Sequence, residues 1–196
     1  MEQKIIAAFD FDGTLTTKDT FVEFMKFTHS PVTFYLKAFL CIPFILAYKW
    51  KMVPNYVAKQ KIFSFFYKGM KYDDFLSYGK QFAKEIDKFV RQDTLQLLQD
   101  HKNRKHKIYV ISAGGIEWIE YWCKLNGVDK VIATTVETDE KGRLTGRFSS
   151  KNCYGEEKVR RFLKEEPSRS SYILYAYGDS EGDKYLLAFA DYGELV

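Results

Sequence analysis

The chain has 196 residues, of which 46% are hydrophobic and 29% charged, which is enough for one folded domain with a buried core. Its net charge of +4 is small and its lysines are scattered, which argues against nucleic acid as a partner. Its three cysteines form neither a CxxC pair nor a zinc-binding spacing, so we expect a protein of the reducing cytoplasm.

The first predicted element is a strand over residues 4–9, KIIAAF, a continuous apolar run typical of a strand buried on both faces. The segment that follows, about 18–88, carries almost only helical patterns. Its four predicted helices lie at 19–27, 34–50, 55–69 and 73–89. We therefore expect a helical insert between the first strand and the rest of the fold.

The run 34–50, FYLKAFLCIPFILAYKW, is the most apolar stretch of this insert. It is shorter than the roughly 20 residues of a membrane-spanning helix, and Lys37 and Pro43 interrupt it. We expect a helix packed against its neighbours in the insert. The alternative is peripheral contact with a membrane, because residues 48–51 combine aromatic and lysine side chains, as segments at a membrane interface do.

Strand and helix patterns alternate over the second half of the chain. Apolar runs predict strands at 107–111, 131–135 and 172–177, and helical spacing predicts helices at 93–103, 115–127 and 155–165. Residues 136–148 predict a β-hairpin that turns at Lys141-Gly142. This alternation predicts an α/β fold, a Rossmann-like parallel sheet with right-handed crossovers.

Polar side chains follow three of the predicted strands at their carboxyl ends, where the reactive groups of open α/β sheets gather. They are Asp10 and Asp12 after the first strand, Ser112 after the second, and Asp179 and Asp183 after the last. Converging carboxylates repel one another unless a cation lies among them. Oxygen ligands of this kind suit Mg²⁺, so the pattern predicts a magnesium site.

Four segments, in this order, resemble the four motifs of the haloacid dehalogenase (HAD) superfamily of phosphotransferases: DFDGTLT, VISAGG, the lysine of GEEK (Lys158) and YGDSEGD. The stretch GRLTGRF is similar to the phosphoserine-phosphatase-like branch, subfamily IB. The resemblance implies an α/β core over 1–17 and 89–196 and a type 1 helical-bundle cap over 18–88. It also implies hinges near 16–18 and 89–92.

The resemblance further implies a phosphatase, a phosphomonoester hydrolase that uses Mg²⁺ as its cofactor. Asp10 would be the nucleophile that becomes an aspartyl-phosphate, and Asp12 the general acid and base. Ser112 would donate a hydrogen bond to the phosphoryl group, and Lys158 would supply positive charge.

The same resemblance assigns the remaining site residues. The Asp10 carboxylate, the Asp12 backbone carbonyl and Asp179 would bind the metal, while Asp183 would bind a metal-bound water or hold Lys158. The phosphoryl oxygens would meet the backbone N–H groups around four residues, Gly13, Thr14, Ala113 and Gly114.

The substrate is less defined by the sequence. Asp19 lies where phosphoserine phosphatases carry a cap glutamate that meets the substrate, although an aspartate there is also a good helix N-cap. The ISAGG and Gly182 positions depart from the phosphoserine phosphatase pattern. We therefore expect a small, phosphoserine-like phosphomonoester as substrate, and keep three alternatives: a membrane-associated lipid phosphatase of the phosphatidylglycerophosphatase type, a phosphomutase, and a catalytically silent phosphate-binding domain.

Overall fold

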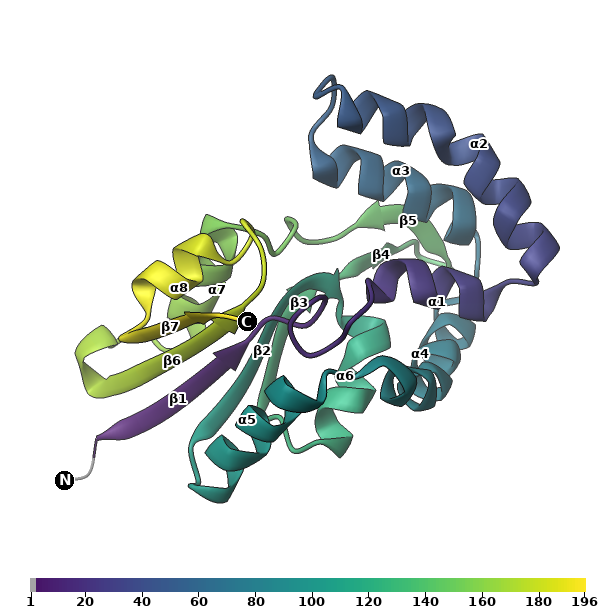
Figure 1. The fold of residues 1–196 in the computed structure, drawn as a ribbon. Helices are drawn as coiled ribbons and strands as arrows, with labels where there is room; N and C mark the ends of the chain where they lie inside the picture. The colour runs from purple at the N-terminus through teal and green to yellow at the C-terminus, as the bar shows by residue number, and fades with distance from the viewer. Residues whose placement is uncertain (1–2) are drawn as a thin grey trace.

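A computed structural model describes residues 3–196 and contains a five-stranded parallel sheet (Figure 1). The strands lie in the order β3-β2-β1-β6-β7, and all four pairings are parallel. Their bounds are Lys4–Phe9 for β1, Lys107–Gly115 for β2, Lys130–Thr134 for β3, Tyr172–Gly178 for β6 and Tyr192–Leu195 for β7. The predicted α/β fold with a parallel sheet is confirmed.

Helices cover both faces of this sheet, which explains the continuous apolar character of its inner strands. On one face lie α5 (Gln92–Asn103) and α6 (Ile116–Leu125), and on the other lie α7 (Glu156–Glu165) and α8 (Lys184–Phe189). Alternate residues of β1 point to opposite faces of the sheet and pack in different cores. Ala7 and Phe9 belong to the core under α5 and α6, whereas Ile6 and Ala8 belong to the core under α7 and α8.

The predicted strands and helices of the second half are all present, with two differences. β2 continues through the glycines to Gly115, so α6 begins one residue later than expected. The C-terminal elements α8 and β7 were not predicted from the sequence. The expected hairpin is β4 (Val136–Thr138) and β5 (Leu144–Phe148), with Gly142 in the left-handed region at φ 66°.

Between β1 and the rest of the sheet lie four cap helices, as predicted. They are α1 (Thr20–Thr28), α2 (Pro31–Lys49), α3 (Asn55–Tyr67) and α4 (Tyr72–Ile86), followed by a short 3₁₀ turn, Asp87–Phe89. Phe24 of α1 is fully buried at their centre and contacts aromatic rings of three other elements: Tyr67 of α3, Phe75 and Phe82 of α4, and Trp118 of α6. The aromatic content of the insert thus forms a core shared with the catalytic domain.

Helix α4 joins the insert to the sheet domain by packing directly against α6 (Figure 1). The contact is close because α4 carries a glycine there: a Cβ at Gly79 would lie 2.0 Å from the backbone oxygen of Glu117. On the other side, the β4–β5 hairpin packs on α3, and the backbone of Gly69 donates to the carbonyl of Leu144 at 2.8 Å. The cap therefore contacts the core through both α4 and the hairpin.

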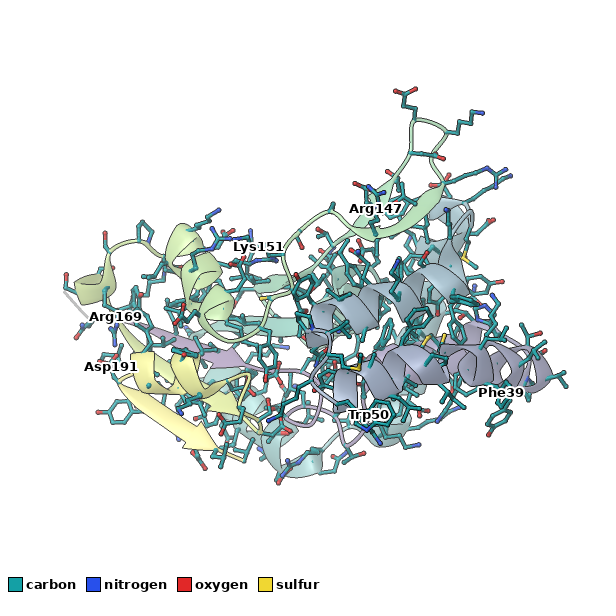
Figure 2. The ribbon with its side chains drawn as sticks, turned by 90° about the horizontal axis from the view of Figure 1, so that it is seen from above. Phe39, Trp50, Arg147, Lys151, Arg169 and Asp191 are labelled. Carbon is teal, nitrogen blue, oxygen red and sulfur yellow. The ribbon has the colours of Figure 1, made fainter. Side chains whose placement is uncertain are left out.

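Helix α2 differs from its prediction. The run is helical, but its neighbours do not bury it, and only 6% of its most apolar 18-residue window is buried. Phe34 and Cys41 are its only buried residues. Phe39 in the middle of the helix and Trp50 at its C-cap are each about 70% exposed (Figure 2). By length and composition alone, this is the one helix among residues 3–196 that could cross a membrane.

Candidate active site

The turn that follows β1 presents two aspartates to a cavity and turns its intervening phenylalanine away. The backbone N–H of Asp10 donates to the carbonyl of Tyr177 on β6 at 2.9 Å, which fixes the start of the turn at the sheet edge. Phe11 is fully buried and meets the Trp122 ring edge-on, at 5.4 Å between centroids. Asp10 and Asp12 both line the cavity, so the turn separates its two carboxylates from the buried phenylalanine between them.

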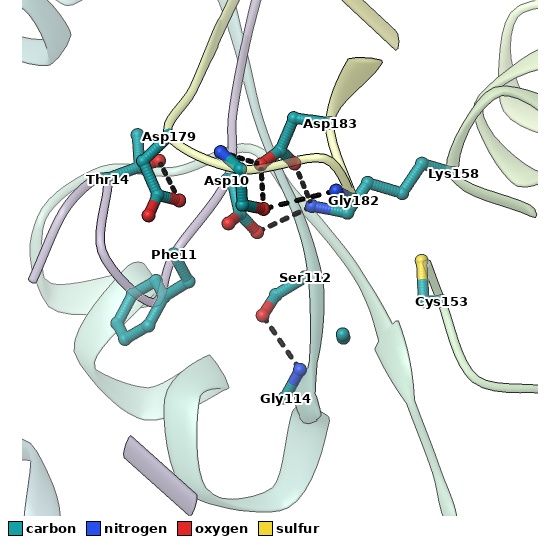
Figure 3. A network of polar contacts seen from close by, with 12 residues as sticks. Asp10, Phe11, Thr14, Ser112, Gly114, Cys153, Lys158, Asp179, Gly182 and Asp183 are labelled. Carbon is teal, nitrogen blue, oxygen red and sulfur yellow. Dashed lines mark hydrogen bonds and ion pairs between the residues drawn. The ribbon is translucent and has the colours of Figure 1, made fainter. Parts of the chain in front are cut away.

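Lys158 lies between two of the aspartates (Figure 3). Its Nζ donates to Asp10 Oδ1 at 2.6 Å and to Asp183 Oδ1 at 2.5 Å, and all three side chains are buried. The other oxygen of Asp183 accepts from the backbone N–H and the hydroxyl of Ser180. Of the two roles expected for Asp183, holding Lys158 is therefore the contact that the structure contains.

Burial and charge shift the ionisation of this trio. Burial raises the pKa of Asp10 to about 7, with the charge of Lys158 opposing the rise and that of Asp183 adding to it. For Lys158, burial alone would lower the pKa, but the charges of Asp10 and Asp183 outweigh it and raise the pKa. Lys158 is thus held in its charged form beside Asp10, the expected nucleophile.

Asp179 approaches the same cluster from the end of β6. Carboxylate oxygens of Asp10, Asp179 and Asp183 all lie within 4.8 Å of one another. Thr14 Oγ1 donates to Asp179 Oδ1 at 3.3 Å, and a Cβ at Gly13 would lie only 2.2 Å from Asp179 Oδ2, at a φ of 87°. A glycine is therefore required for the turn and the carboxylate to meet.

This cluster fits a divalent cation. Burial raises the pKa of Asp179 as well, and the charge of Asp183 adds to the rise. Asp10 and Asp179, whose negative charge is disfavoured, form with Asp183 a cluster of hard oxygen atoms that Mg²⁺ would stabilise. Lys158 already occupies one oxygen each of Asp10 and Asp183, which leaves Asp179 and the second oxygen of Asp10 as the side-chain ligands.

Asp12 has the environment of a group that gains and loses a proton. Its Oδ1 accepts from the backbone N–H of Thr20 at 2.7 Å, which aims the carboxylate along the start of α1. Burial raises the pKa of Asp12 to about 6, and the charge of Asp19 adds to the rise. A pKa close to neutrality suits a general acid and base.

Ser112 and its neighbours bring the end of β2 to the cavity. The buried Ser112 Oγ accepts from the backbone N–H of Gly114 at 2.9 Å, so its hydroxyl hydrogen is available to an oxygen in the cavity (Figure 3). Ser112 and Ala113 both line that cavity. Gly114 lies behind them, where a Cβ would come within 3.3 Å of Asp12.

Asp19 is the N-cap of α1. Its Oδ1 accepts from the backbone N–H groups of Phe21 and Val22, at 2.8 and 3.2 Å. The side chain is exposed and also lines the cavity, so capping and substrate contact are compatible for this residue.

The cavity holds about 550 Å³ between the core and the cap. Its floor carries Asp10, Asp12, Ser112 and Lys158, whereas its cap side is largely apolar. The apolar lining includes Phe21 and Met25 of α1, Phe34 and Cys41 of α2, and Ile62 and Phe66 of α3. The site thus combines a polar phosphoryl-binding end with a hydrophobic chamber.

Three residues of the site were not identified from the sequence. Lys59 of α3 reaches the cavity from the cap, and its Nζ donates to the carbonyl of Ala113 at 2.8 Å. Arg91 donates to the carbonyl of Gly13 at 2.9 Å, and the hydroxyl of Thr94 donates to the carbonyl of Thr14 at 2.6 Å. No local sequence signal marks these residues, because each acts through a contact distant in the chain.

Comparisons with known proteins identify the family of this chain. The model of the haloacid dehalogenase-like hydrolase family matches residues 7–188. The chain belongs to this family. The resemblance noted in the sequence is thereby confirmed, and so is the expectation that this protein is a hydrolase.

Relatives of this HAD hydrolase include Protein CicA of Caulobacter vibrioides, which is 27% identical over 190 residues that cover 96% of this chain and 84% of CicA. Among solved structures, a protein of unknown function from Bordetella pertussis matches with a TM-score of 0.79 and 17% identity, covering 96% of this chain and 88% of its own. A substrate-bound phosphoserine phosphatase matches with a TM-score of 0.64 and 19% identity, covering 97% and 84%. The fold is therefore the one that phosphoserine phosphatases share.

Proposed function

We propose that this HAD hydrolase cleaves phosphomonoesters with Mg²⁺ through an aspartyl-phosphate on Asp10. The observation that carries the proposal is the geometry around Lys158, which pairs with Asp10 and Asp183 at 2.6 and 2.5 Å beside Asp179. A phosphate-binding domain without catalysis would need no acid and base, yet Asp12 lies in the same cavity with a pKa of about 6. One of the structural neighbours is a phospho-aspartyl intermediate analogue of phosphoserine phosphatase, which supports the same chemistry here.

The proposed reaction has two steps. A carboxylate oxygen of Asp10 attacks phosphorus, the bond from phosphorus to the ester oxygen breaks, and Asp12 gives its proton to the departing alkoxide. Asp12 then takes a proton from water, whose oxygen attacks phosphorus and releases phosphate from Asp10. Lys158 and Ser112 stabilise the phosphoryl oxygens in both steps. Mg²⁺ would be held by the carboxylates of Asp10 and Asp179 and by the backbone carbonyl of Asp12. Its positive charge would reduce the repulsion between the Asp10 carboxylate and the phosphoryl group.

A small metabolite such as phosphoserine remains the first candidate substrate. Lys59 and Asp19 reach the cavity from the cap side, and they offer opposite charges to a zwitterionic leaving group. The apolar lining from three cap helices favours a second candidate, a phosphomonoester with a hydrophobic part, as expected for the lipid phosphatase alternative. The cytoplasmic location stays a prediction from the sequence.

Phosphate release with Mg²⁺ tests the proposal. We expect turnover of several phosphomonoesters by the wild type, none by Asp10→Asn, and slow turnover by Asp12→Ala. Full activity in Asp10→Asn would contradict the covalent route. Transfer of the phosphoryl group to a sugar hydroxyl, without release of phosphate, would instead indicate a phosphomutase.

A further inference from the structure

The outer face of α2 is an exposed apolar surface on the cap. It consists of Tyr35, Leu36, Phe39, Leu40, Ile42 and Leu46, which are between 39% and 69% exposed. These side chains lie at helical spacing, so they form one continuous strip. Soluble monomers rarely leave an apolar strip of this extent without a partner.

The exposure is not the result of a detached helix. The opposite stripe of α2 carries Phe34, Ala38 and Cys41, and it lines the catalytic cavity. α2 packs against α3, and Lys37 donates to the carbonyl of Phe66 at 3.0 Å. The helix is thus apolar on its inner side, where it lines the cavity, and apolar again on its outer side.

Charge on the surrounding segment identifies the partner. Residues 24–72 contain no aspartate or glutamate, while the α2–α3 hairpin, residues 31–67, contains five lysines. Lys49 and Lys51 are exposed at the end of α2, beside Trp50, which is 70% exposed. Exposed indole and lysine side chains beside an apolar strip match the headgroup region of an anionic bilayer. A second copy of the same cationic hairpin would instead be repelled.

The helix is placed to lie on a bilayer and not to cross it. Crossing would remove its inner stripe from α3 and open the cavity that holds Asp10 and Asp12. Helix α2 is not itself a removable leader, because β1 and the catalytic turn precede it in the chain and belong to the sheet domain.

We propose that the outer face of α2 seats this protein on the surface of an anionic lipid bilayer, so that the cavity beneath the helix receives a phosphomonoester with a hydrocarbon chain. Docking on the bilayer is inferred from the outer face of α2 alone. The substrate class rests on the proposed function, because it concerns the same catalytic site.

Sedimentation with vesicles tests the docking. Wild-type protein and the double variant Leu36→Glu/Phe39→Glu are each mixed with vesicles of phosphatidylcholine, with and without phosphatidylglycerol. The matched control is Tyr121→Glu/Leu125→Glu, which places the same two charges at side chains 43% and 65% exposed on α6 of the core. We expect the wild type and the control to sediment with the anionic vesicles. The double variant should bind at least about tenfold more weakly, since two apolar side chains that would enter the bilayer are lost.

Two results would overturn docking: wild-type protein that stays in solution with both vesicle types, or a double variant that binds as tightly as the control. Loss of a dimer in the double variant, without vesicle binding by the wild type, would assign the surface to a second copy and also overturn it.

Activity separates this inference from the proposed function. p-Nitrophenyl phosphate, a water-soluble monoester, needs only the catalytic residues, so wild type and double variant should hydrolyse it equally. Lysophosphatidic acid in anionic vesicles should be hydrolysed by the wild type and at least about tenfold more slowly by the double variant. Hydrolysis of the soluble ester alone would overturn the lipid substrate. Hydrolysis of neither would overturn the proposed function, while sedimentation would still decide the docking.

Discussion

Lys59 on cap helix α3 donates a hydrogen bond of 2.8 Å to the backbone carbonyl of Ala113, which directly follows Ser112 in the catalytic core. The contact places a cation on the cap side of the cavity, opposite the aspartates. Burial lowers the pKa of Lys59, and the charge of Asp12 opposes this. This hydrogen bond holds the lysine of the helical insert beside the end of β2, next to Ser112.

Replacing Lys59 by methionine should therefore impair catalysis. We expect kcat/KM for p-nitrophenyl phosphate to fall about tenfold to a hundredfold, since a hydrogen bond from a charged group is lost near the substrate anion. Steady-state kinetics measures this. Lys61→Met, on the same helix with an exposed side chain, is the control and should keep the wild-type value. Equal kinetics in the two variants would remove Lys59 from the site.

The hydroxyl of Thr94 supports the catalytic turn from the start of α5. It is buried and donates to the carbonyl of Thr14 at 2.6 Å. Thr94→Val leaves that buried carbonyl without a donor, so we expect the free energy of unfolding to fall by about 1–3 kcal/mol. Urea denaturation measures the change, and Thr94→Ser, which keeps the hydroxyl, should recover most of it. A loss in Thr94→Ser as large as in Thr94→Val would mean that the methyl group matters and the hydrogen bond does not.

The buried His101 should make stability depend on pH. Burial, with the nearby His106, lowers the pKa of His101 to about 4, from an ordinary value of 6.5. Because the unfolded chain takes up this proton first, the stabilisation is complete above pH 6.5 and is lost as pH falls toward 4. The full loss is on the order of 3 kcal/mol.

Comparison with His101→Gln isolates this contribution, because the other titrating groups are common to both proteins. The free energy of unfolding from urea curves should fall more steeply in the wild type than in the variant between pH 6.5 and 4. Parallel curves over that range would show that His101 is not the group responsible.

Mg²⁺ should stabilise the folded protein. At a concentration of about a hundred times its Kd, the ion adds about 2.7 kcal/mol to the free energy of unfolding if it binds only the folded state. Thermal unfolding with and without Mg²⁺ measures the shift. Asp179→Asn removes one of the three clustered carboxylates and should abolish it, whereas Glu181→Gln, exposed two residues on, should not. An equal shift in Asp179→Asn would place the ion elsewhere.

The sheet and its catalytic floor could be predicted from the sequence because their signals are local. A buried parallel strand is apolar throughout, and the carboxyl ends of such strands meet at one edge, so the residues after each run had to converge. The helix that carries Lys158 could be predicted, because its glutamates precede its basic residues. Lys158 was chosen over the other basic residues nearby through the resemblance of GEEK to the HAD pattern, and its contacts with Asp10 and Asp183 span 148 and 25 residues of chain.

The environment of α2 could not be predicted in the same way. A helix that is apolar on every side has the same composition whether protein or lipid surrounds it. Lys59, Arg91 and Thr94 were missed because each meets its partner across more than 50 residues of chain. Helix α8 has six residues and the exposed edge strand β7 has four, so both are too short to show a period.

The hinges near 16–18 and 89–92 stay a prediction, but the structure shows that hydrogen bonds connect these two segments. Thr17 donates to the carbonyl of Phe89 through both its backbone N–H and its hydroxyl, at 2.8 and 3.0 Å. The backbone N–H of Arg91 donates to the carbonyl of Leu15 at 2.9 Å. The two connections between core and cap therefore lie side by side, as a two-stranded hinge would.

Trapping the covalent intermediate tests the central claim most directly. Wild-type protein is mixed with a radiolabelled phosphomonoester and Mg²⁺, quenched in acid within the first turnover, and digested for peptide mapping. The account predicts label on the peptide that contains Asp10, and no label in Asp10→Asn. Label on any other residue, or rapid phosphate release with no labelled peptide at any quench time, would contradict it.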